Sequence, residues 1–364
     1  MNKLNNYIPI MSPKLGELKA IKTLSENALK DFTPLFDVHR PPIAGGKRKT
    51  IDEHIKKIII NIEKYLINKI FIVDYSLIDL NLRMDDDTHP LQYLLNQLTS
   101  KNINFIPTVG IDRDQAYLSV IKEFVSKNPN NPICLRLLRD DIDSSEQANV
   151  EINQIMSYLK LNPKNCDLLI DCKYIEQNQI ESIIDSLSEL NEAITFMNWR
   201  SLILTASSFP LDMTGIPPDS HISIPRFEFD LWEAAILASP LVGRKPKFGD
   251  YCIVNPDRPD LDAVTMRAGG KIRYTTTKTW EIFRGHGLHK GEKYDQYRSL
   301  SKKVIESQFF LGADYSWGDN YISNCANGNA KTGNLTTWIS VDVNHHLTLV
   351  GEQISNSDAL SSIG

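Results

Sequence analysis

The stretch Cys166–Ile175, CDLLIDCKYI, decides how the first two thirds of the chain are interpreted. As a β-strand it places Leu168 and Ile170 on one face and Asp171 and Lys173 on the other. A parallel strand covered on both faces would be apolar throughout. Because this one becomes polar on one face only, near its C-terminal end, it is typical of a (β/α)8 barrel strand with functional groups at its C-terminal mouth.

Length and composition agree with a soluble barrel protein. The chain has 364 residues, 41% hydrophobic and 23% charged, with a net charge of −5. The mild acidity argues against nonspecific coating of DNA but permits a locally basic mouth. Five cysteines form no C-x-x-C pair, so we predict reduced, buried thiols. We find no N-terminal signal and no long apolar run, so we expect a cytoplasmic protein that does not contact a membrane.

Candidate strands alternate with amphipathic helical segments, which is the rhythm of a parallel α/β sheet. The strands are Tyr7–Met11, Thr33–His39, Lys69–Ser76, Asn104–Asp112, Pro132–Leu138, Asp167–Lys173, Leu202–Ser207 and Ile222–Glu228. Since these are eight strands, we predict that residues 1–240 form a (β/α)8 TIM-like barrel.

After Ser239 the alternation of strands and helices ends. The remaining segment has β-like runs at Lys271–Thr276 and Trp338–Val343, and one clear helix at roughly Lys293–Gln308. We therefore predict that residues 241–364 form a mixed α/β extension that packs on the barrel.

We call this comparison of the two faces of a strand the face test, and the other predicted strands give the same result. Seven strands carry polar groups on one face near the same end, and in a barrel these groups would converge on one mouth. Besides Asp171 and Lys173, the polar groups are Asp37, His39, Asp74, Ser76, Thr108, Asp112, Arg136, Thr205, Ser207, Arg226 and Glu228.

The charged members of this predicted layer allow two interpretations. Carboxylates suit a divalent cation, and guanidinium or ammonium groups suit a phosphate or carboxylate ligand. Alternatively, the carboxylates and cations neutralise one another as structural ion pairs. The carboxylates are Asp37, Asp74 and Asp171, and the cations are Arg136, Lys173 and Arg226.

His39 is the candidate general acid or base, because it ends a strand beside Asp37. With Asp37, Asp74 and Asp171 it forms the predicted catalytic set. The pair His39-Arg40 after an early barrel strand resembles glycerophosphodiester phosphodiesterases, but their further carboxylate pattern is missing. Lys173 would also permit Schiff-base chemistry, although an ion pair with Asp171 is the plainer interpretation.

An ordered series of short motifs resembles the beta family proteins of bacteria and phages. The motifs include Tyr7-Ile-Pro-Ile, Thr33-Pro-Leu-Phe-Asp37, Leu169-Ile-Asp171, Pro225-Arg226-Phe-Glu228, Phe248-Gly-Asp250-Tyr251, Ile272-Arg273-Tyr274-Thr275, Arg284-Gly285, Trp317-Gly318-Asp319 and Asn344-His345-His346. The resemblance implies that the C-terminal segment is integral to the fold. It also implies a shared polar site that includes Arg226, Glu228, Asp250, Tyr251, Arg273, Tyr274, Arg284, Asp319, His345 and His346.

The resemblance implies a role in anti-phage defence or in mobile elements. From the mixed charged layer we expect a mouth that binds a phosphorylated ligand, a nucleotide or a nucleic-acid end, with hydrolysis, assisted by a divalent cation, as a further option.

The alternative function is a non-catalytic scaffold or sensor for a protein partner from a defence complex. We expect such a module to expose an aromatic patch, and an enzyme to bury the same side chains around its mouth. The aromatic residues are Phe309, Phe310, Tyr315, Trp317 and Tyr321.

Overall fold

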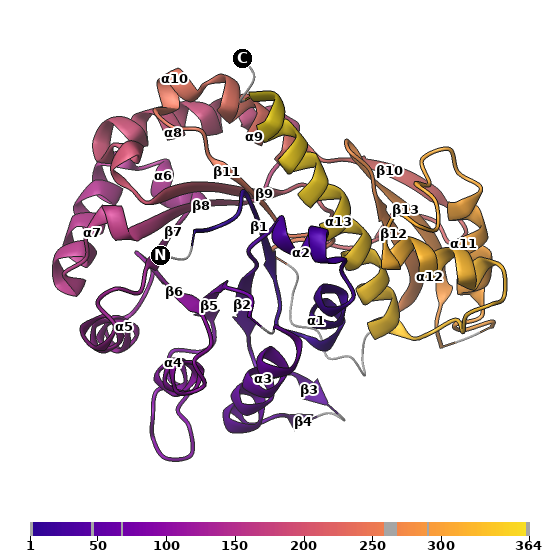
Figure 1. Cartoon of the computed structure of the whole chain (residues 1–364), viewed down its shortest axis with the longest axis horizontal. Coiled ribbons are helices and arrows are strands. Elements are labelled where there is room, and N and C mark those ends of the chain that lie inside the picture. Colours follow the sequence, from indigo (N-terminus) through magenta and orange to yellow (C-terminus); the bar gives the residue numbers. More distant parts are fainter. Residues whose placement is uncertain (1–2, 45–46, 67, 258–267, 290, 362–364) are drawn as a thin grey trace.

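The computed structural model contains a closed parallel barrel ringed by helices and a smaller sheet-and-helix unit beside it (Figure 1). It describes residues 3–44, 47–66, 68–257, 268–289 and 291–361. In barrel order the strands are β1 (Tyr7–Met11), β11 (Lys247–Asp250), β9 (Ser201–Ser207), β8 (Cys166–Tyr174), β7 (Ile133–Leu138), β6 (Phe105–Gly110), β5 (Phe71–Leu77) and β2 (Leu35–His39). The predicted TIM-like barrel is confirmed, and seven of its strands are the predicted ones.

The prediction of Ile222–Glu228 as the eighth barrel strand is wrong. Residues His221–Pro225 form β10, which pairs with β13 (Thr279–Gly287) outside the barrel, and exposed residues alternate with half-buried ones along it. The eighth strand is β11, which follows residue 240. Its four residues, KFGD, have no apolar run, and a Cβ at Gly249 would lie 2.1 Å from the Thr205 hydroxyl. Gly249 therefore allows β11 to lie close to β9, and the local sequence alone does not reveal this requirement.

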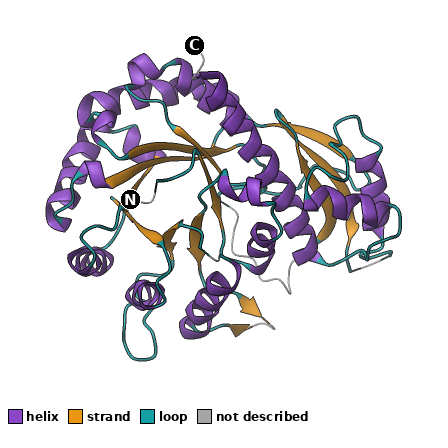
Figure 2. Ribbon diagram, viewed as in Figure 1, coloured by secondary structure: helices purple, strands orange, loops and turns teal. Residues whose placement is uncertain are grey.

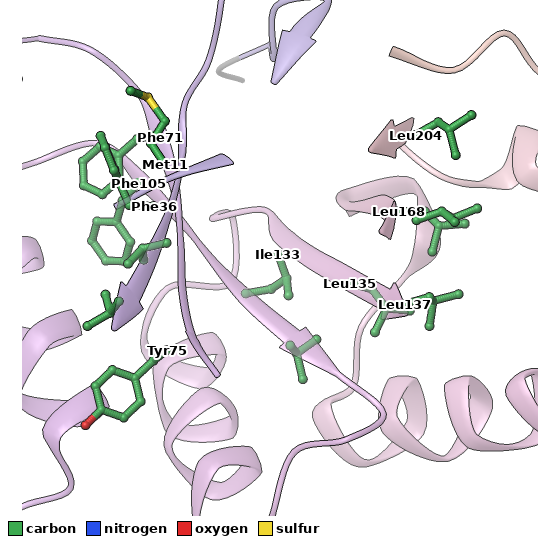
Figure 3. Packing of buried hydrophobic residues seen from close by; sticks show 14 of the residues in the cluster. Met11, Phe36, Phe71, Tyr75, Phe105, Ile133, Leu135, Leu137, Leu168 and Leu204 are labelled. Carbon is green, nitrogen blue, oxygen red and sulfur yellow. The ribbon is translucent and has the colours of Figure 1, made fainter. Parts of the chain in front are cut away.

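The face test is confirmed by the packing of the barrel strands. Leu169, Ile72 and Cys134 belong to the cluster inside the barrel, whereas Leu168 and Phe71 belong to the larger cluster between strands and helices. Figure 3 shows outward side chains of this larger cluster between the strands and the surrounding helices. Asp171, Asp74 and Arg136 lie two residues after Leu169, Ile72 and Cys134 and share their strand faces. These polar side chains therefore point into the barrel.

The outer ring consists of helices that bury one apolar stripe each. In α3 the stripe contains Ile55, Ile58, Ile59 and Ile62, and Thr50 caps the helix by accepting a hydrogen bond from the Glu53 amide. The helices of residues 1–242 are α1 (Leu15–Lys22), α2 (Glu26–Lys30), α3 (Ile51–Tyr65), α4 (Pro90–Ser100), α5 (Gln115–Lys127), α6 (Arg139–Ile142), α7 (Ser145–Leu159), α8 (Ile180–Ile194), α9 (Phe227–Leu237) and α10 (Ser239–Val242). A two-stranded hairpin, β3 (Ile43–Ala44) and β4 (Lys47–Arg48), follows β2.

The described residues of the extension form the antiparallel sheet β10–β13–β12 and three helices (Figure 2). Strand β12 (Gly269–Thr275) confirms the predicted run at Lys271–Thr276, and α11 (Gln296–Ile305) confirms the predicted helix. Two further helices follow, α12 (Trp317–Ala326) and α13 (Leu335–Ser361). The β-like interpretation of Trp338–Val343 is wrong, because the apolar spacing continues helically through Leu347, Val350 and Ile354, which are buried.

Helix α13 joins the two parts of the molecule. It packs on β12 and α12 of the extension and on α1, α2 and β1 of the barrel (Figure 1). A Cβ at Gly16 of α1 would lie 2.7 Å from Ile339 of α13, so the two helices can cross this closely only because Gly16 has no side chain. No helix in the described part of the chain has the length and apolarity needed to cross a membrane.

Candidate functional site

Arg136 lies at the centre of the barrel and is saturated with hydrogen bonds. Its Nη1 donates to Asp37 at 2.6 Å and to Asp74 at 2.7 Å, and its Nη2 donates to Asp171 at 2.7 Å and to the Tyr251 hydroxyl at 2.9 Å. The Nε donates to Asp171 at 3.1 Å, and the residue is 2% exposed. We call these five residues the barrel centre.

The barrel centre contains side chains that the face test assigns to one layer. The cation between its three carboxylates is a guanidinium, so the geometry favours the ion-pair interpretation over a metal ion among the same oxygens. All nitrogens of Arg136 already donate to protein oxygens, and this leaves no donor for a phosphate.

Electrostatics keep Asp171 and Asp74 of the barrel centre ionised. Burial alone would raise the pKa of Asp171, but Lys173, Arg136 and the Tyr251 hydroxyl lower it to about 2. Burial likewise opposes ionisation of Asp74, and the cations Arg113 and Arg136 outweigh it and lower the pKa of Asp74. Each carboxylate is therefore matched by a positive group.

Arg113 and Lys173 complete this balance at the edge of the barrel centre. Arg113 bonds to Asp74 at 3.0 Å, and its side chain is 5% exposed. Lys173 lies 3.2 Å from Asp171, and its side chain is 27% exposed. A register shift follows Asp171, and Lys173 has a positive φ of 55°, so it leaves the regular alternation and reaches toward solvent.

A pocket of about 300 Å³ lies beside the barrel centre, where β1, β2 and β11 end. Tyr251 borders both, because its hydroxyl bonds to Asp171 and the residue also lines the pocket. The polar and charged lining includes Ser12, Lys14, Glu17, Asp37, His39, Asn255 and Arg273. His39 and Asp37 thus both line this pocket, and the catalytic role of His39 stays a prediction.

A second polar group connects the barrel to the extension. The Tyr7 hydroxyl donates to Asp250 at 2.9 Å, and Nε2 of His346 lies 2.9 Å from Asp250 and 3.1 Å from the Tyr7 hydroxyl. Nδ1 of His346 lies 2.9 Å from the Thr275 hydroxyl. We call Tyr7, Asp250, Thr275 and His346 the seam, since they come from β1, β11, β12 and α13.

Burial sets the protonation of the seam. It lowers the pKa of His346, which favours the neutral imidazole, although Asp250 opposes the shift. Burial also disfavours ionised Asp250, but His346 and Arg226 outweigh it and lower the pKa of Asp250. The seam thus pairs an anionic carboxylate with an imidazole.

The other candidates of the extension form separate pairs. Asp319 accepts from the Tyr274 hydroxyl at 2.7 Å and lies 2.8 Å from Nδ1 of His345. Arg273, which lines the pocket, donates through Nε to Asp342 at 2.7 Å. Burial raises the pKa of Asp342 to about 6, although Arg273 opposes the shift.

The prediction that Arg226 lies in the same layer as Arg136 is wrong, and so is the placement of Glu228 on a barrel strand. Arg226 precedes α9 and donates to Glu228 at 3.2 Å, to the Thr276 carbonyl and to Gln353. Arg284 lies apart from the pocket lining and donates to the Met213 and Ile216 carbonyls. Both arginines connect backbone segments of the extension region.

The burial of the five aromatic residues does not distinguish a scaffold from an enzyme. Phe309, Phe310, Trp317 and Tyr321 are partly buried against the core of the extension, and Tyr315 against the main core. None of them lines the pocket, so these side chains neither form a mouth nor present a fully exposed patch.

Sequence reasoning missed several residues that complete these groups. Arg113 and Cys252 directly follow predicted residues, Asp112 and Tyr251, so their positions carried a usable signal. Tyr7 and Thr275 lie in the family motifs, but nothing in the sequence assigns them to a site, because their partners are distant in the chain; Asp342 carried no signal.

Two solved structures are similar to part of this chain: a thiamine phosphate pyrophosphorylase from Pyrococcus furiosus and a psychrophilic glycoside hydrolase family 10 endo-β-1,4-xylanase. They are 10% and 7% identical, with TM-scores of 0.31 and 0.36, and each alignment covers 68% of this chain and 85% of the other. The search of curated proteins found no significant match. The family model described as "Beta protein" matches residues 7–352, and the chain therefore belongs to the Beta protein family.

Proposed function

We propose that this protein binds a small phosphorylated ligand, a nucleotide or a nucleic-acid end, in the pocket at the barrel mouth. The observation that carries the proposal is the pocket itself, about 300 Å³ at the C-terminal ends of three barrel strands. That position is where barrels of this type hold their ligands, and the volume suits a small molecule.

Three groups support an anionic ligand. Lys14 and Arg273 line the pocket, and so does the first turn of α1, whose amide groups carry the positive end of the helix dipole. Lys14 occupies the N-cap position and makes no side-chain cap there. Two acidic residues, Glu17 and Asp37, also line the pocket, and Asp37 is neutralised by Arg136. Arg273 is itself paired with Asp342 through Nε, so the proposal rests mainly on Lys14 and the first turn of α1.

Hydrolysis of the ligand is the catalytic form of this proposal. His39 would act as the acid or base at the pocket rim, and Asp37 would hold it or a water molecule in place. The implied setting, conflict between bacteria and phages, stays a prediction from the family resemblance.

A panel of nucleotides, short 5′-phosphorylated DNA and RNA, and inorganic phosphate tests binding by thermal shift, with and without Mg²⁺. A ligand at 100 times its Kd stabilises a protein by about 2.7 kcal/mol, which is readily measured. We expect Lys14→Ala to weaken binding several-fold. Lys19→Ala is the matched control, because Lys19 is an exposed lysine of the same helix outside the pocket.

Two results would contradict binding: no panel member raises Tm at millimolar concentration, or Lys14→Ala and Lys19→Ala weaken binding equally. Product analysis of the same mixtures tests hydrolysis, which we expect to fall at least tenfold in His39→Asn while binding persists.

The second candidate function, a non-catalytic scaffold or sensor in a defence complex, is favoured by one observation. All donors of Arg136 are satisfied within the protein, so the barrel centre is neutralised without a ligand. Binding of a ligand without turnover, combined with co-purification of a protein partner that depends on the ligand, would favour this sensor function.

A further inference from the structure

Three potential metal ligands meet next to the pocket. The carboxylate of Asp250, the thiol of Cys252 and the imidazole of His346 each place one ligand atom within 4.8 Å of the other two, and all three residues are buried. In a tetrahedral zinc site, bond lengths of 2.0–2.3 Å place neighbouring ligand atoms about 3.3–3.8 Å apart. Side-chain adjustments of about 1 Å would therefore bring these atoms to bonding positions.

Neighbouring groups already orient two of the ligands. One oxygen of Asp250 accepts from the Tyr7 hydroxyl at 2.9 Å and from the Cys252 amide at 3.0 Å, so the other oxygen faces His346. Thr275 holds Nδ1 of His346 at 2.9 Å, which directs Nε2 toward the cluster. Such outer contacts fix the orientation of metal ligands in metalloproteins.

The third ligand is held by an unusual backbone conformation. Cys252 has φ of 52°, in the left-handed region that non-glycine residues seldom adopt. Strain of this kind persists where the surrounding structure requires it, and it often accompanies function. Cys252 also lines the pocket, which gives an ion or a ligand a route to the cluster.

We propose that Asp250, Cys252 and His346 bind a divalent transition metal of the zinc class. One carboxylate and one thiolate neutralise the charge of the dication, and the mixed O, S and N donors suit zinc rather than magnesium or calcium, which prefer oxygen ligands. Three protein ligands leave a fourth position for water or for a ligand that enters through the pocket. This site is distinct from the phosphate-binding groups Lys14 and Arg273 and can be tested without any phosphorylated compound.

Cobalt binding provides the direct test, because a thiolate bound to Co²⁺ produces a charge-transfer absorption in the near ultraviolet. The full-length protein, freed of metal with a chelator, is titrated with Co²⁺ and then with Zn²⁺. We expect about one equivalent of Co²⁺ with the thiolate band, and loss of the band when Zn²⁺ displaces it.

Variants assign the ligands. We expect Cys252→Ser to abolish the band and His346→Gln to weaken Co²⁺ binding at least tenfold. Cys134→Ser, at a buried cysteine inside the barrel, should keep both the band and the affinity. Circular dichroism of each variant verifies folding.

The proposal is overturned if folded wild-type protein binds less than one tenth of an equivalent of Co²⁺, or binds it without the thiolate band. It is also overturned if the band persists in Cys252→Ser. Because the wild-type spectrum decides the first two outcomes, the test holds even if a variant fails to fold.

Discussion

The barrel centre and the seam are both buried and polar, but they are built in opposite ways. In the barrel centre, three carboxylates surround Arg136, with Arg113 and Lys173 at the edge, so each buried carboxylate has a positive partner. In the seam, Asp250 faces His346, the Tyr7 hydroxyl and a nearby thiol, and no guanidinium among the described residues is bonded to it. The comparison indicates that the first region is complete without a ligand, whereas the second retains groups that a cation could use.

The largest effect is expected from removing the central cation. Arg136→Met would leave Asp37 buried without its positive partner, while Asp74 and Asp171 keep Arg113 and Lys173. Breaking a buried ion pair in this way costs about 3–5 kcal/mol. Urea unfolding at pH 7 measures the loss of stability.

Arg139→Met is the control for that variant. Arg139 is a half-buried arginine whose ion-pair partner, Asp143, is exposed, and we expect a loss below about 1 kcal/mol. Equal losses in the two variants would show that the barrel centre is hydrated and tolerant, and the contrast with the seam would disappear.

The next largest effect concerns pH and the groups around the seam. Burial raises the pKa of Glu228 from 4.5 to about 7, although Arg226 opposes the shift. The folded state then binds more protons than the unfolded state, so stability falls as pH rises from about 4.5 to 7. The loss from this group is roughly 3 kcal/mol at most, and Asp342 acts in the same direction.

Glu228→Gln should flatten this part of the pH profile of unfolding free energy. Glu233→Gln is the control, because Glu233 is an exposed glutamate of the same helix. The barrel centre behaves oppositely: the stabilisation by Asp171 is present above pH 4 and is lost as pH falls through about 2. A profile that Glu228→Gln leaves unchanged between pH 4.5 and 7 would contradict the assigned burial effect.

The smallest effect is expected from Lys173→Met. Asp171 would keep Arg136 and the Tyr251 hydroxyl, and the Lys173 side chain is already 27% exposed. We expect a loss below about 1 kcal/mol in the same urea experiment. A loss of several kcal/mol that Asp171→Asn restores would instead make Lys173 an essential buried partner.

The same contrast explains what the sequence can reveal. Strand periodicity assigns each side chain to a face, so the amino-acid pattern alone is enough to group Asp37, Asp74, Arg136 and Asp171. Seven barrel strands are recognisable because each is an apolar run of ordinary length. The eighth, Lys247–Asp250, is too short and too polar to be recognised, and the alternating run around Ile222 and Ile224 has the stronger strand pattern.

The seam cannot be predicted in this way. Tyr7 and His346 are 339 residues apart, and His346 and Asp250 are 96 apart, so only the docking of α13 brings them together. The family motifs indicate Asp250 and His346 as candidates, but spacing alone does not show that they share a site with Cys252. Part of α13 even resembles a strand in sequence, because apolar and polar side chains alternate from Ile339 to Val343.

The central claim is that ligand chemistry lies in the pocket next to the seam, while the barrel centre is a structural ion-pair cluster. A crystal structure of the protein soaked with the tightest phosphorylated compound of the panel tests this most directly. We predict phosphate density in the pocket within hydrogen-bonding distance of Lys14 or Arg273, with the ion pairs of Arg136 intact. Phosphate bound directly to Arg136, with Asp37 displaced, would contradict the account.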